Sequence, residues 1–221
     1  MRAASAPLSR LSGVVRISCF PRLAHDILPG LVMTIRRRHP DIRFEMDTSL
    51  DPERLVRGEC DIGVWWGSAV PERLIATPAG TAEFVLYAHR DYLARRGVPT
   101  TLAEALTHDL VSTTDRNELR VGARRFGANL LNVKFAALCD SPAMELAMIR
   151  AGAGIGLCLS AAAARDPDLI AVRIPGVERR EPVTVYRHEA QATTPRIALV
   201  CEALADLLRV TFEAVLAPEA R

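Results

Sequence analysis

Small hydroxyl side chains stand beside the predicted starts of helices in this 221-residue sequence. Thr48 and Ser49 follow one predicted strand, and Ser141 precedes a helix that Pro142 opens. Unsatisfied N–H groups and the positive end of the helix dipole meet at such places, so a hydroxyl there can help to bind a carboxylate or carbonyl oxygen. The alternative is that each hydroxyl only caps its own helix, which contributes about 1 kcal/mol and needs no ligand. The two roles can coexist.

Arg22, Trp65 and Trp66 add one charge and two aromatic rings to this set. Arg22 could pair bidentately with an acidic ligand, although an exposed arginine without a ligand is the simpler alternative. Consecutive strand residues face opposite sides of a sheet, so we expect one tryptophan to pack on the sheet and the other to wall a ligand cleft.

The cysteines offer a second kind of chemistry. Cys19 and Cys139 would both end strands that face the cleft, where a thiol-based or metal-sensing role is one alternative. We favour the other, a small buried hydrophobic side chain, because the cysteines are odd in number, widely spaced and mostly set in apolar runs. That pattern is typical of reduced thiols in a cytoplasmic core. The five are Cys19, Cys60, Cys139, Cys158 and Cys201.

The local motifs of the common enzyme classes are missing. The sequence has no G-x-S-x-G, H-E-x-x-H, C-x-x-C or Walker motif. Gly152, Gly154 and Gly156 form a G-x-G-x-G run, but it lies between a predicted helix and the following strand, the reverse of the order that cradles a dinucleotide. The five histidines are scattered and show no metal-ligand spacing. We therefore expect a binding protein, not an enzyme, with no cofactor and no metal.

Composition favours a folded protein without electrostatic attraction to nucleic acid. Hydrophobic residues make up 49% of the chain, and its 28 basic and 26 acidic side chains nearly cancel. A chain of this size can bury a sizeable core, and it lacks the excess positive field that draws proteins to DNA or anionic membranes. Residues 1–16 have neither the apolar region of a secretory signal nor a membrane helix. We expect a soluble cytoplasmic protein.

Strands and helices alternate along the first part of the chain. The predicted order is a strand over 14–19, a helix that Asp26 caps and that ends before Pro40, a strand over 42–47, a helix opened by Asp51 and Pro52 that stops at Gly58, and a strand over 61–66. Parallel neighbours need a helix-length return path, so this order predicts an α/β fold with a parallel sheet and right-handed crossovers.

The same alternation returns further along. The predicted elements are strands over 83–88, 110–112, 133–139, 155–159 and 182–187, a helix from Ser141 through Arg150 that Gly152 closes, and a final helix opened by Thr194 and Pro195. The polar stretch over 89–101 suggests that the chain leaves the first sheet there. We expect a linker remnant over 1–13, a first lobe over 14–88 plus 189–221, and a second lobe over 89–188.

Four stretches of the sequence resemble one known family in wording and order. They are GVVRIS (13–18), ILPGLVMTIRRRHPDIRFEM (27–46), LVRGECDIGV (55–64) and IRAGAGIGLCLS (149–160). Over roughly Leu11 to Leu216 the chain resembles the effector-binding domain of LysR-type transcription regulators. This resemblance implies a type 2 periplasmic-binding-protein-like fold, with two Rossmann-like lobes of mixed, mainly parallel sheets joined by two crossover segments.

The resemblance also implies partners. The family binds a small organic effector in the cleft between its lobes and assembles as homodimers or homotetramers. A winged helix-turn-helix and a linker helix precede this domain in the family, and residues 1–13 hold only the tail of such a linker. DNA contact is therefore expected only through an N-terminal domain absent from this chain, and no membrane contact is expected.

Ligands of open α/β sheets bind outside the carboxyl ends of the strands. Many LysR-type relatives place an arginine at one of the two tryptophan positions, so its absence favours a flat, aromatic or apolar effector over a carboxylate at that spot. Ser160 likewise stands where the family often has proline. The expected effector-binding residues are Cys19, Phe20, Arg22, Thr48, Ser49, Trp65, Trp66, Thr113, Asp140 and Ser141.

Other readings of the same pattern stay open. A stand-alone cytoplasmic solute-binding protein would share the two-lobed cleft, and an enzyme on this fold need not carry a local motif. A dimerisation module is compatible with the apolar helix over 27–35, which in LysR-type domains tends to pair across subunits. Sensing and pairing do not exclude each other.

Overall fold

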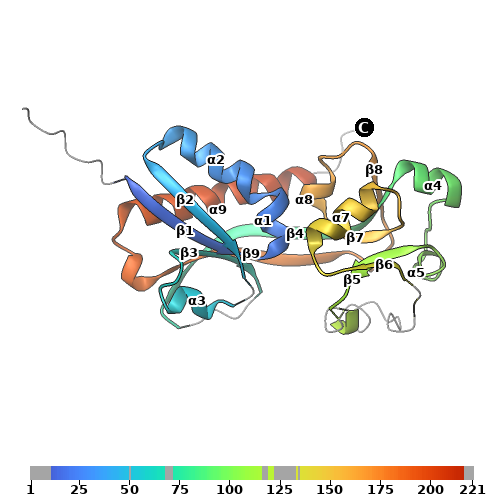
Figure 1. Cartoon of the computed structure of the whole chain (residues 1–221), viewed down its shortest axis with the longest axis horizontal. Coiled ribbons are helices and arrows are strands. Elements are labelled where there is room, and N and C mark those ends of the chain that lie inside the picture. Colours follow the sequence, from blue (N-terminus) through green and yellow to red (C-terminus); the bar gives the residue numbers. More distant parts are fainter. Residues whose placement is uncertain are drawn as a thin grey trace, which may run out of the picture. The chain divides into compact units, whose positions relative to one another are not determined.

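The computed structural model describes residues 11–49, 51–67, 72–115, 119–121, 133 and 135–216 (Figure 1). The chain forms two compact units. Unit 1 contains Met1–Thr81 and Glu181–Glu213, and unit 2 contains Ala82–Arg180 and Ala214–Arg221. Each unit combines helices with strands, so the expectation of a two-lobed α/β fold is confirmed.

Unit 1 is built around the central strand β1, which runs parallel to β2 on one side and to β3 on the other. β9 pairs antiparallel with β3, and β4 follows β9 in the strand order, so the sheet is mixed. The strands are β1 (Gly13–Cys19), β2 (Ile42–Thr48), β3 (Ile62–Trp66), β4 (Leu74–His89) and β9 (Arg179–His188).

The helices of unit 1 correct one sequence-based boundary. Asp26 does not cap a helix, because α1 already begins at Pro21 and Asp26 is its last residue. α2 follows at once, joined through Ile27, and it ends at Arg38, before Pro40 as predicted. Asp51 accepts a hydrogen bond from the Glu53 N–H at 3.0 Å, just ahead of α3. The helices are α1 (Pro21–Asp26), α2 (Leu28–Arg38), α3 (Glu53–Val56), the 3₁₀ turn η2 (Glu189–Gln191) and α9 (Pro195–Leu216).

α9 packs directly on the first half of β4. A Cβ atom at Gly80 would lie 3.3 Å from the Cα of Arg209, so the glycine lets the helix approach the strand backbone. The apolar stripe of α9 is buried from Ile197 to Phe212, whereas Val215 is only half-buried. The fully buried members are Ile197, Cys201, Leu204, Leu208 and Phe212.

Unit 2 has two groups of strands. β5 and β6 pair in parallel, and the second half of β4 pairs antiparallel with β7 and β8. A parallel bridge between Leu110 and Ile155 links β5 to the residue that precedes β7. These elements are β5 (Leu110–Thr113), β6 (Phe135–Cys139), β7 (Gly156–Leu159), β8 (Leu169–Val172), α4 (Arg90–Arg96), α5 (Leu102–Ala105), α7 (Pro142–Arg150) and α8 (Ser160–Ala163).

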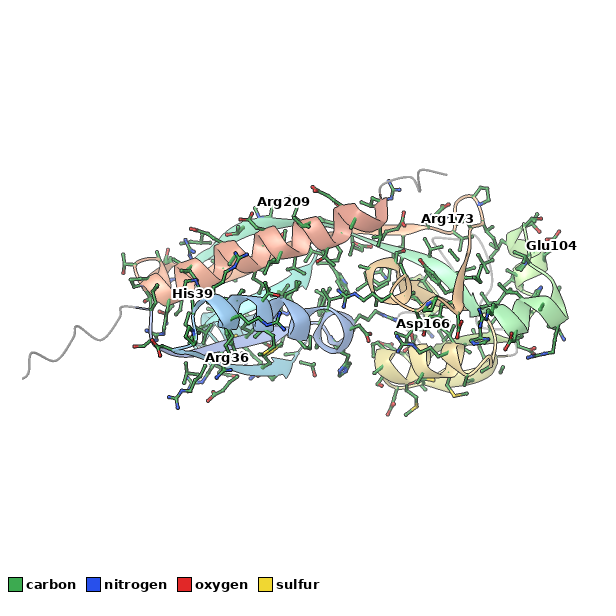
Figure 2. The ribbon with its side chains drawn as sticks, turned by 90° about the horizontal axis from the view of Figure 1, so that it is seen from above. Arg36, His39, Glu104, Asp166, Arg173 and Arg209 are labelled. Carbon is green, nitrogen blue, oxygen red and sulfur yellow. The ribbon has the colours of Figure 1, made fainter. Side chains whose placement is uncertain are left out.

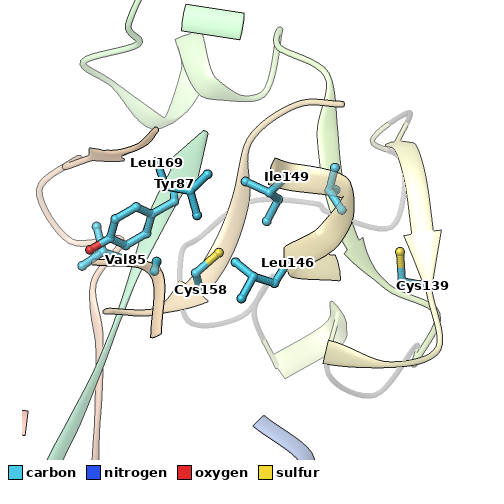
Figure 3. Close-up of a cluster of buried hydrophobic side chains, with 9 residues drawn as sticks. Val85, Tyr87, Cys139, Leu146, Ile149, Cys158 and Leu169 are labelled. Carbon is cyan, nitrogen blue, oxygen red and sulfur yellow. The ribbon is translucent and has the colours of Figure 1, made fainter. Parts of the chain in front are cut away.

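A buried cluster holds α7 against the strands of unit 2. Figure 3 shows Tyr87 and Val85 on β4, Cys158 on β7, and Leu146 and Ile149 reaching in from α7. The apolar residues of α7 fall at helical spacing, which is why one side of this short helix can be buried. The cluster keeps the start of α7 beside the end of β6.

Two strands belong to both units. β4 crosses the division between Thr81 and Ala82, and β9 crosses it between Arg180 and Glu181. These are the two crossover segments that the fold implies. No helix among the described residues is long and apolar enough to span a bilayer.

Candidate functional site

The carboxyl ends of three parallel strands meet at one edge of unit 1. Cys19 at the end of β1 lies in register with Thr48 of β2 and Val64 of β3. The Ser49 N–H donates to the Cys19 carbonyl at 3.1 Å, and the Phe20 N–H donates to the Val64 carbonyl at 3.3 Å. The chain segments that leave these strands are therefore held together, as expected for a ligand-binding edge of an α/β sheet.

The two tryptophans have different environments at this edge. Trp65 is 3% exposed, and its indole N–H donates to the Ser49 carbonyl at 3.3 Å. Its ring lies over Gly63, where a Cβ atom would be 2.0 Å from a ring carbon, and 5.7 Å from the ring of Tyr186. Trp65 is thus the ring that packs on the sheet, and Trp66 points to the other face.

Trp66 and Phe20 form a half-buried aromatic pair. Their ring centroids are 4.4 Å apart at an interplanar angle of 53°. Phe20 belongs to the connection between β1 and α1, and Arg22 lies half-buried in the first turn of α1. The pair leaves aromatic surface accessible to solvent beside the ends of β1 and β3.

The hydroxyls of this edge are placed differently. Thr48 is exposed at the end of β2. Ser49 is half-buried, and its hydroxyl oxygen accepts a hydrogen bond from the Asp51 N–H at 3.0 Å. A hydroxyl carries one donor and two acceptor lone pairs, so accepting this bond does not use the proton of the Ser49 O–H.

Arg54 fixes the loop that carries these hydroxyls. Its guanidinium donates to both carboxylate oxygens of Asp47, at 2.9 and 3.0 Å, and to Glu59 at 2.9 Å. The buried Ser18 donates to Asp47 at 2.7 Å from β1. Burial disfavours the charged form of Asp47, but the hydrogen bonds from Arg54 and Ser18 outweigh it and hold its pKa below the usual value.

Cys19 is not presented at this edge. It is fully buried, its thiol lies 3.8 Å from the Asp47 carbonyl oxygen, and burial together with the Asp47 charge raises its pKa to about 12. Cys139 is also buried, and burial raises its pKa as well. Among the described residues no group of three His, Cys, Asp or Glu side chains could hold a metal ion.

Unit 2 has a comparable edge at the ends of β5 and β6. Thr113 lies in register with Cys139, and the Thr114 N–H donates to the Cys139 carbonyl at 2.8 Å. Asp140 is exposed, and the Ser141 hydroxyl accepts from the Met144 N–H at 3.2 Å, so Ser141 caps α7 as expected. Within this unit the structure brings Thr113, Asp140 and Ser141 to one edge.

Sequence reasoning missed a buried carboxylate on β4. Glu83 has a side chain only 2% exposed and receives hydrogen bonds from Ser160 at 3.3 Å and from Arg180 at 3.1 Å. Arg173 lies 3.7 Å from the same carboxylate. Two features of the sequence could have indicated this carboxylate. Glu83 is an acidic residue inside a mainly apolar predicted strand, and Ser160, its partner in space, stands where the family often has proline. The Asp47 and Arg54 pair was missed as well, since seven residues separate the partners.

Comparison with known proteins decides the family. A model described as the LysR substrate binding domain matches residues 9–209. This chain belongs to that family. The LysR domain thus accounts for nearly all of the described residues, and the sequence-based assignment is confirmed.

Curated relatives of this LysR domain are regulators. The HTH-type transcriptional activator AaeR of Escherichia coli K12 is 23% identical over 145 residues, which cover 65% of this chain and 47% of that protein. The HTH-type transcriptional regulator PgrR of the same strain is 27% identical over 105 residues, covering 47% of this chain and 35% of that protein. The chain spans about half the length of the curated relatives it matches.

Solved LysR-type structures share the fold. The regulatory domain of CrgA from Neisseria meningitidis is 18% identical with a TM-score of 0.73, covering 88% of this chain and 98% of that one. The regulatory domain of AphB from Vibrio vulnificus is 16% identical with a TM-score of 0.67 and the same coverage. This LysR domain therefore corresponds to the regulatory region of such proteins, and its family and fold are those of transcriptional regulators.

Proposed function

We propose that this LysR domain senses a small organic effector at the carboxyl edge of its strands. The observation that carries the proposal is the half-buried Phe20 and Trp66 pair, whose centroids lie 4.4 Å apart at the strand edge that also carries Thr48 and Ser49. Soluble proteins bury most aromatic surface, so rings left accessible at an edge that also carries hydroxyl groups favour a ligand there.

The chemistry of this edge favours an aromatic effector. A planar ring stacked on Trp66 or Phe20 would gain about 0.5 to 1.5 kcal/mol beyond the burial of its area. Thr48 and Ser49 can donate to a carboxylate or carbonyl oxygen on the same ligand. That Arg22 pairs with an acidic group of the ligand remains a prediction. That Thr113, Asp140 and Ser141 of unit 2 bind the effector also remains a prediction. Cys19 drops out of the proposed contacts because it is buried.

The regulatory role is the second part of the proposal. The relatives are transcriptional regulators, so we infer that effector binding here biases the arrangement of an oligomer that acts on DNA through a helix-turn-helix region. The shift cannot exceed the difference in the effector's affinity for the two arrangements. We infer a homodimer or homotetramer working in the cytoplasm, and a sensing role without catalysis.

The test is a thermal-shift screen of the purified chain with small aromatic carboxylates and their saturated ring counterparts. At a ligand concentration of about 100 times the dissociation constant, binding should stabilise the fold by about 2.7 kcal/mol. Trp66→Leu and Phe20→Leu should reduce that stabilisation for aromatic ligands, whereas Val98→Ala, at an exposed position, should not. Equal stabilisation of wild type and both ring variants would refute the site.

A further inference from the structure

Arg187 of β9 lies between the sheet of unit 1 and α9. Its register partner is Ile62 of β3, and Val185 precedes it on the same face of β9; both are fully buried. α9 lies beside α2 on unit 1 (Figure 2), and its residue Cys201 is fully buried as well. Burial raises the pKa of Cys201 to about 12, and the charge of Arg187 partly opposes this rise, so the guanidinium lies near the thiol. Arg187 therefore places a positive charge among apolar neighbours.

The buried part of the Arg187 guanidinium has no hydrogen-bond partner. Its Nε and Nη1 atoms are buried, and neither donates a hydrogen bond within the part of the chain that the structure describes. Arg187 also forms no ion pair with any of those residues. A charge taken out of water is strongly disfavoured unless it is paired and hydrogen-bonded. Among the described residues, Arg187 thus lacks the acceptor that its burial requires.

Two other arginines of unit 1 are satisfied by the chain itself. Arg54 donates to two carboxylates of its own unit. Arg196 is half-buried like Arg187, and its Nε donates to the Val14 carbonyl at 3.2 Å. Arg187 differs from both, because its buried donors have no acceptor among the described residues. This difference favours an acceptor that comes from solution.

The chemistry at Arg187 selects a small monovalent anion. A guanidinium stays charged and only donates hydrogen bonds, so its partner must be an acceptor. A water molecule can accept a hydrogen bond but leaves the charge unbalanced, whereas an anion does both. One guanidinium balances one negative charge, and the apolar Ile62 and Val185 side chains beside it supply no further donor for a larger anion. Arg187 as a whole is only half-buried, so part of its side chain stays open to solvent.

We propose that Arg187 binds a small monovalent anion, of the size of chloride, between β9 and α9. The anion accepts hydrogen bonds from the buried side of the guanidinium and neutralises its charge, so it stabilises the packing of α9 on the sheet. This site is separate from the proposed effector contacts. Arg187 is paired with the first residue of β3, whereas Trp66 is the last residue of that strand.

Thermal melts of the full chain in sodium chloride and in sodium gluconate, at one ionic strength, test the site in solution. Gluconate is too large for a buried position and serves as the reference anion. At a chloride concentration of about ten times the dissociation constant, the melting temperature of wild type should rise by about 3 to 5 °C. Arg187→Met should lose this rise. It should still fold in gluconate, because an apolar side chain replaces an unpaired buried charge.

Arg196→Met is the matched control. It removes a half-buried arginine of the same unit whose Nε already has an acceptor, so the rise with chloride should stay. Arg187→Met should also keep the stabilisation by aromatic carboxylates, because it leaves the strand edge unchanged. A chloride response that is equal in wild type and Arg187→Met overturns the proposal.

Crystals of wild type soaked in sodium bromide locate the ion by its anomalous signal. A bromide peak beside the Arg187 guanidinium is expected. A water molecule at that position, or a peak found only elsewhere, overturns the proposal. A peak beside Arg187 without any response to chloride in solution marks an adventitious ion only and overturns it too. The bromide measurement needs no variant, so it decides the matter even if Arg187→Met does not fold.

Discussion

The carboxylate of Glu83 and the guanidinium of Arg180 lie 3.1 Å apart, joining the two strands of unit 2 that continue into unit 1. The pair is asymmetric, because the Glu83 side chain is 2% exposed and that of Arg180 is 64% exposed. Removing Arg180 leaves the buried carboxylate with the Ser160 hydroxyl and the more distant Arg173, 3.7 Å away, whereas removing the Glu83 charge leaves a cation that water can solvate.

We therefore expect Arg180→Met to destabilise the protein by about 1 to 3 kcal/mol, and Glu83→Gln to cost less. Urea unfolding followed by circular dichroism measures both values. Arg95→Met, at an exposed position on α4, serves as the control and should change stability by under about 0.5 kcal/mol. If Arg180→Met behaves like this control, the ion pair does not stabilise the fold.

The Asp47 and Arg54 pair should make stability depend on acid pH. The folded pKa of Asp47 lies below its ordinary value of 3.8, so its contribution is present above that value and is lost as the pH falls through the lower folded pKa. Arg54→Met should weaken this dependence, because only the Ser18 hydrogen bond then holds the Asp47 pKa down, and it should cost little stability at neutral pH because both side chains are partly exposed.

Urea titrations repeated from neutral pH down to about pH 3 compare the slopes of stability against pH. Arg43→Met, exposed on the same strand, should retain the wild-type slope. Arg54 also fixes the loop that carries Thr48 and Ser49. Arg54→Met should therefore weaken effector binding although Arg54 itself is not among the proposed ligand contacts. Unchanged slopes and unchanged binding would argue against this positioning role.

Two glycines should respond to alanine in opposite directions. A Cβ at Gly154 would lie 2.2 Å from the Asp109 carbonyl oxygen, a backbone atom, and the φ of +157° adds strain, so Gly154→Ala should destabilise by several kcal/mol. Gly30 lies in α2, and apart from its chain neighbours and the backbone of its own helix no atom lies within 4 Å of its Cβ position, so Gly30→Ala should stabilise by about 0.5 to 1 kcal/mol. Thermal melts of the two variants, run side by side, check both signs.

All five cysteines are buried in the native fold and should resist alkylation. Burial raises the pKa of Cys19 and of Cys201 to about 12, so neither thiol ionises appreciably near neutral pH. Iodoacetamide labelling read by mass spectrometry should be slow without denaturant and complete in its presence. Rapid labelling of native Cys19 would instead revive a thiol-based role at the strand edge.

Local signals predicted α7 and its surroundings well. Ser141 caps the helix, Pro142 occupies its first turn, and Gly152 adopts a φ of +75° just after its end. Each of these residues acts on its immediate neighbours, so the sequence alone is enough to place them. The same holds for the end of α2 before Pro40.

Two features could not be predicted from the sequence because contacts between distant residues determine them: the start of β4 and the orientation of the two tryptophans. β4 begins at Leu74, well before the predicted start at residue 83, although Pro78 and Gly80 argue against a strand there. The Pro78 carbonyl instead accepts a hydrogen bond from Arg209 of α9 at 3.1 Å, and Gly80 admits that helix. The alternation of side chains along β3 predicts that one tryptophan faces inward but not which one. Gly63 decides this, because its missing side chain leaves space for the ring of Trp65.

The two units differ in how soon during synthesis all of their segments have left the ribosome. Unit 2 consists mainly of one continuous stretch, Ala82–Arg180, so its core can form while the rest of the chain is still being made. Unit 1 must wait for Glu181–Glu213, since β9 completes its sheet and α9 covers it. The strands and helices of unit 1 that precede Ala82 therefore stay without their covering helix until Glu181–Glu213 has been made, so the unfinished unit 1 is where a ribosome-bound chaperone would find exposed apolar surface.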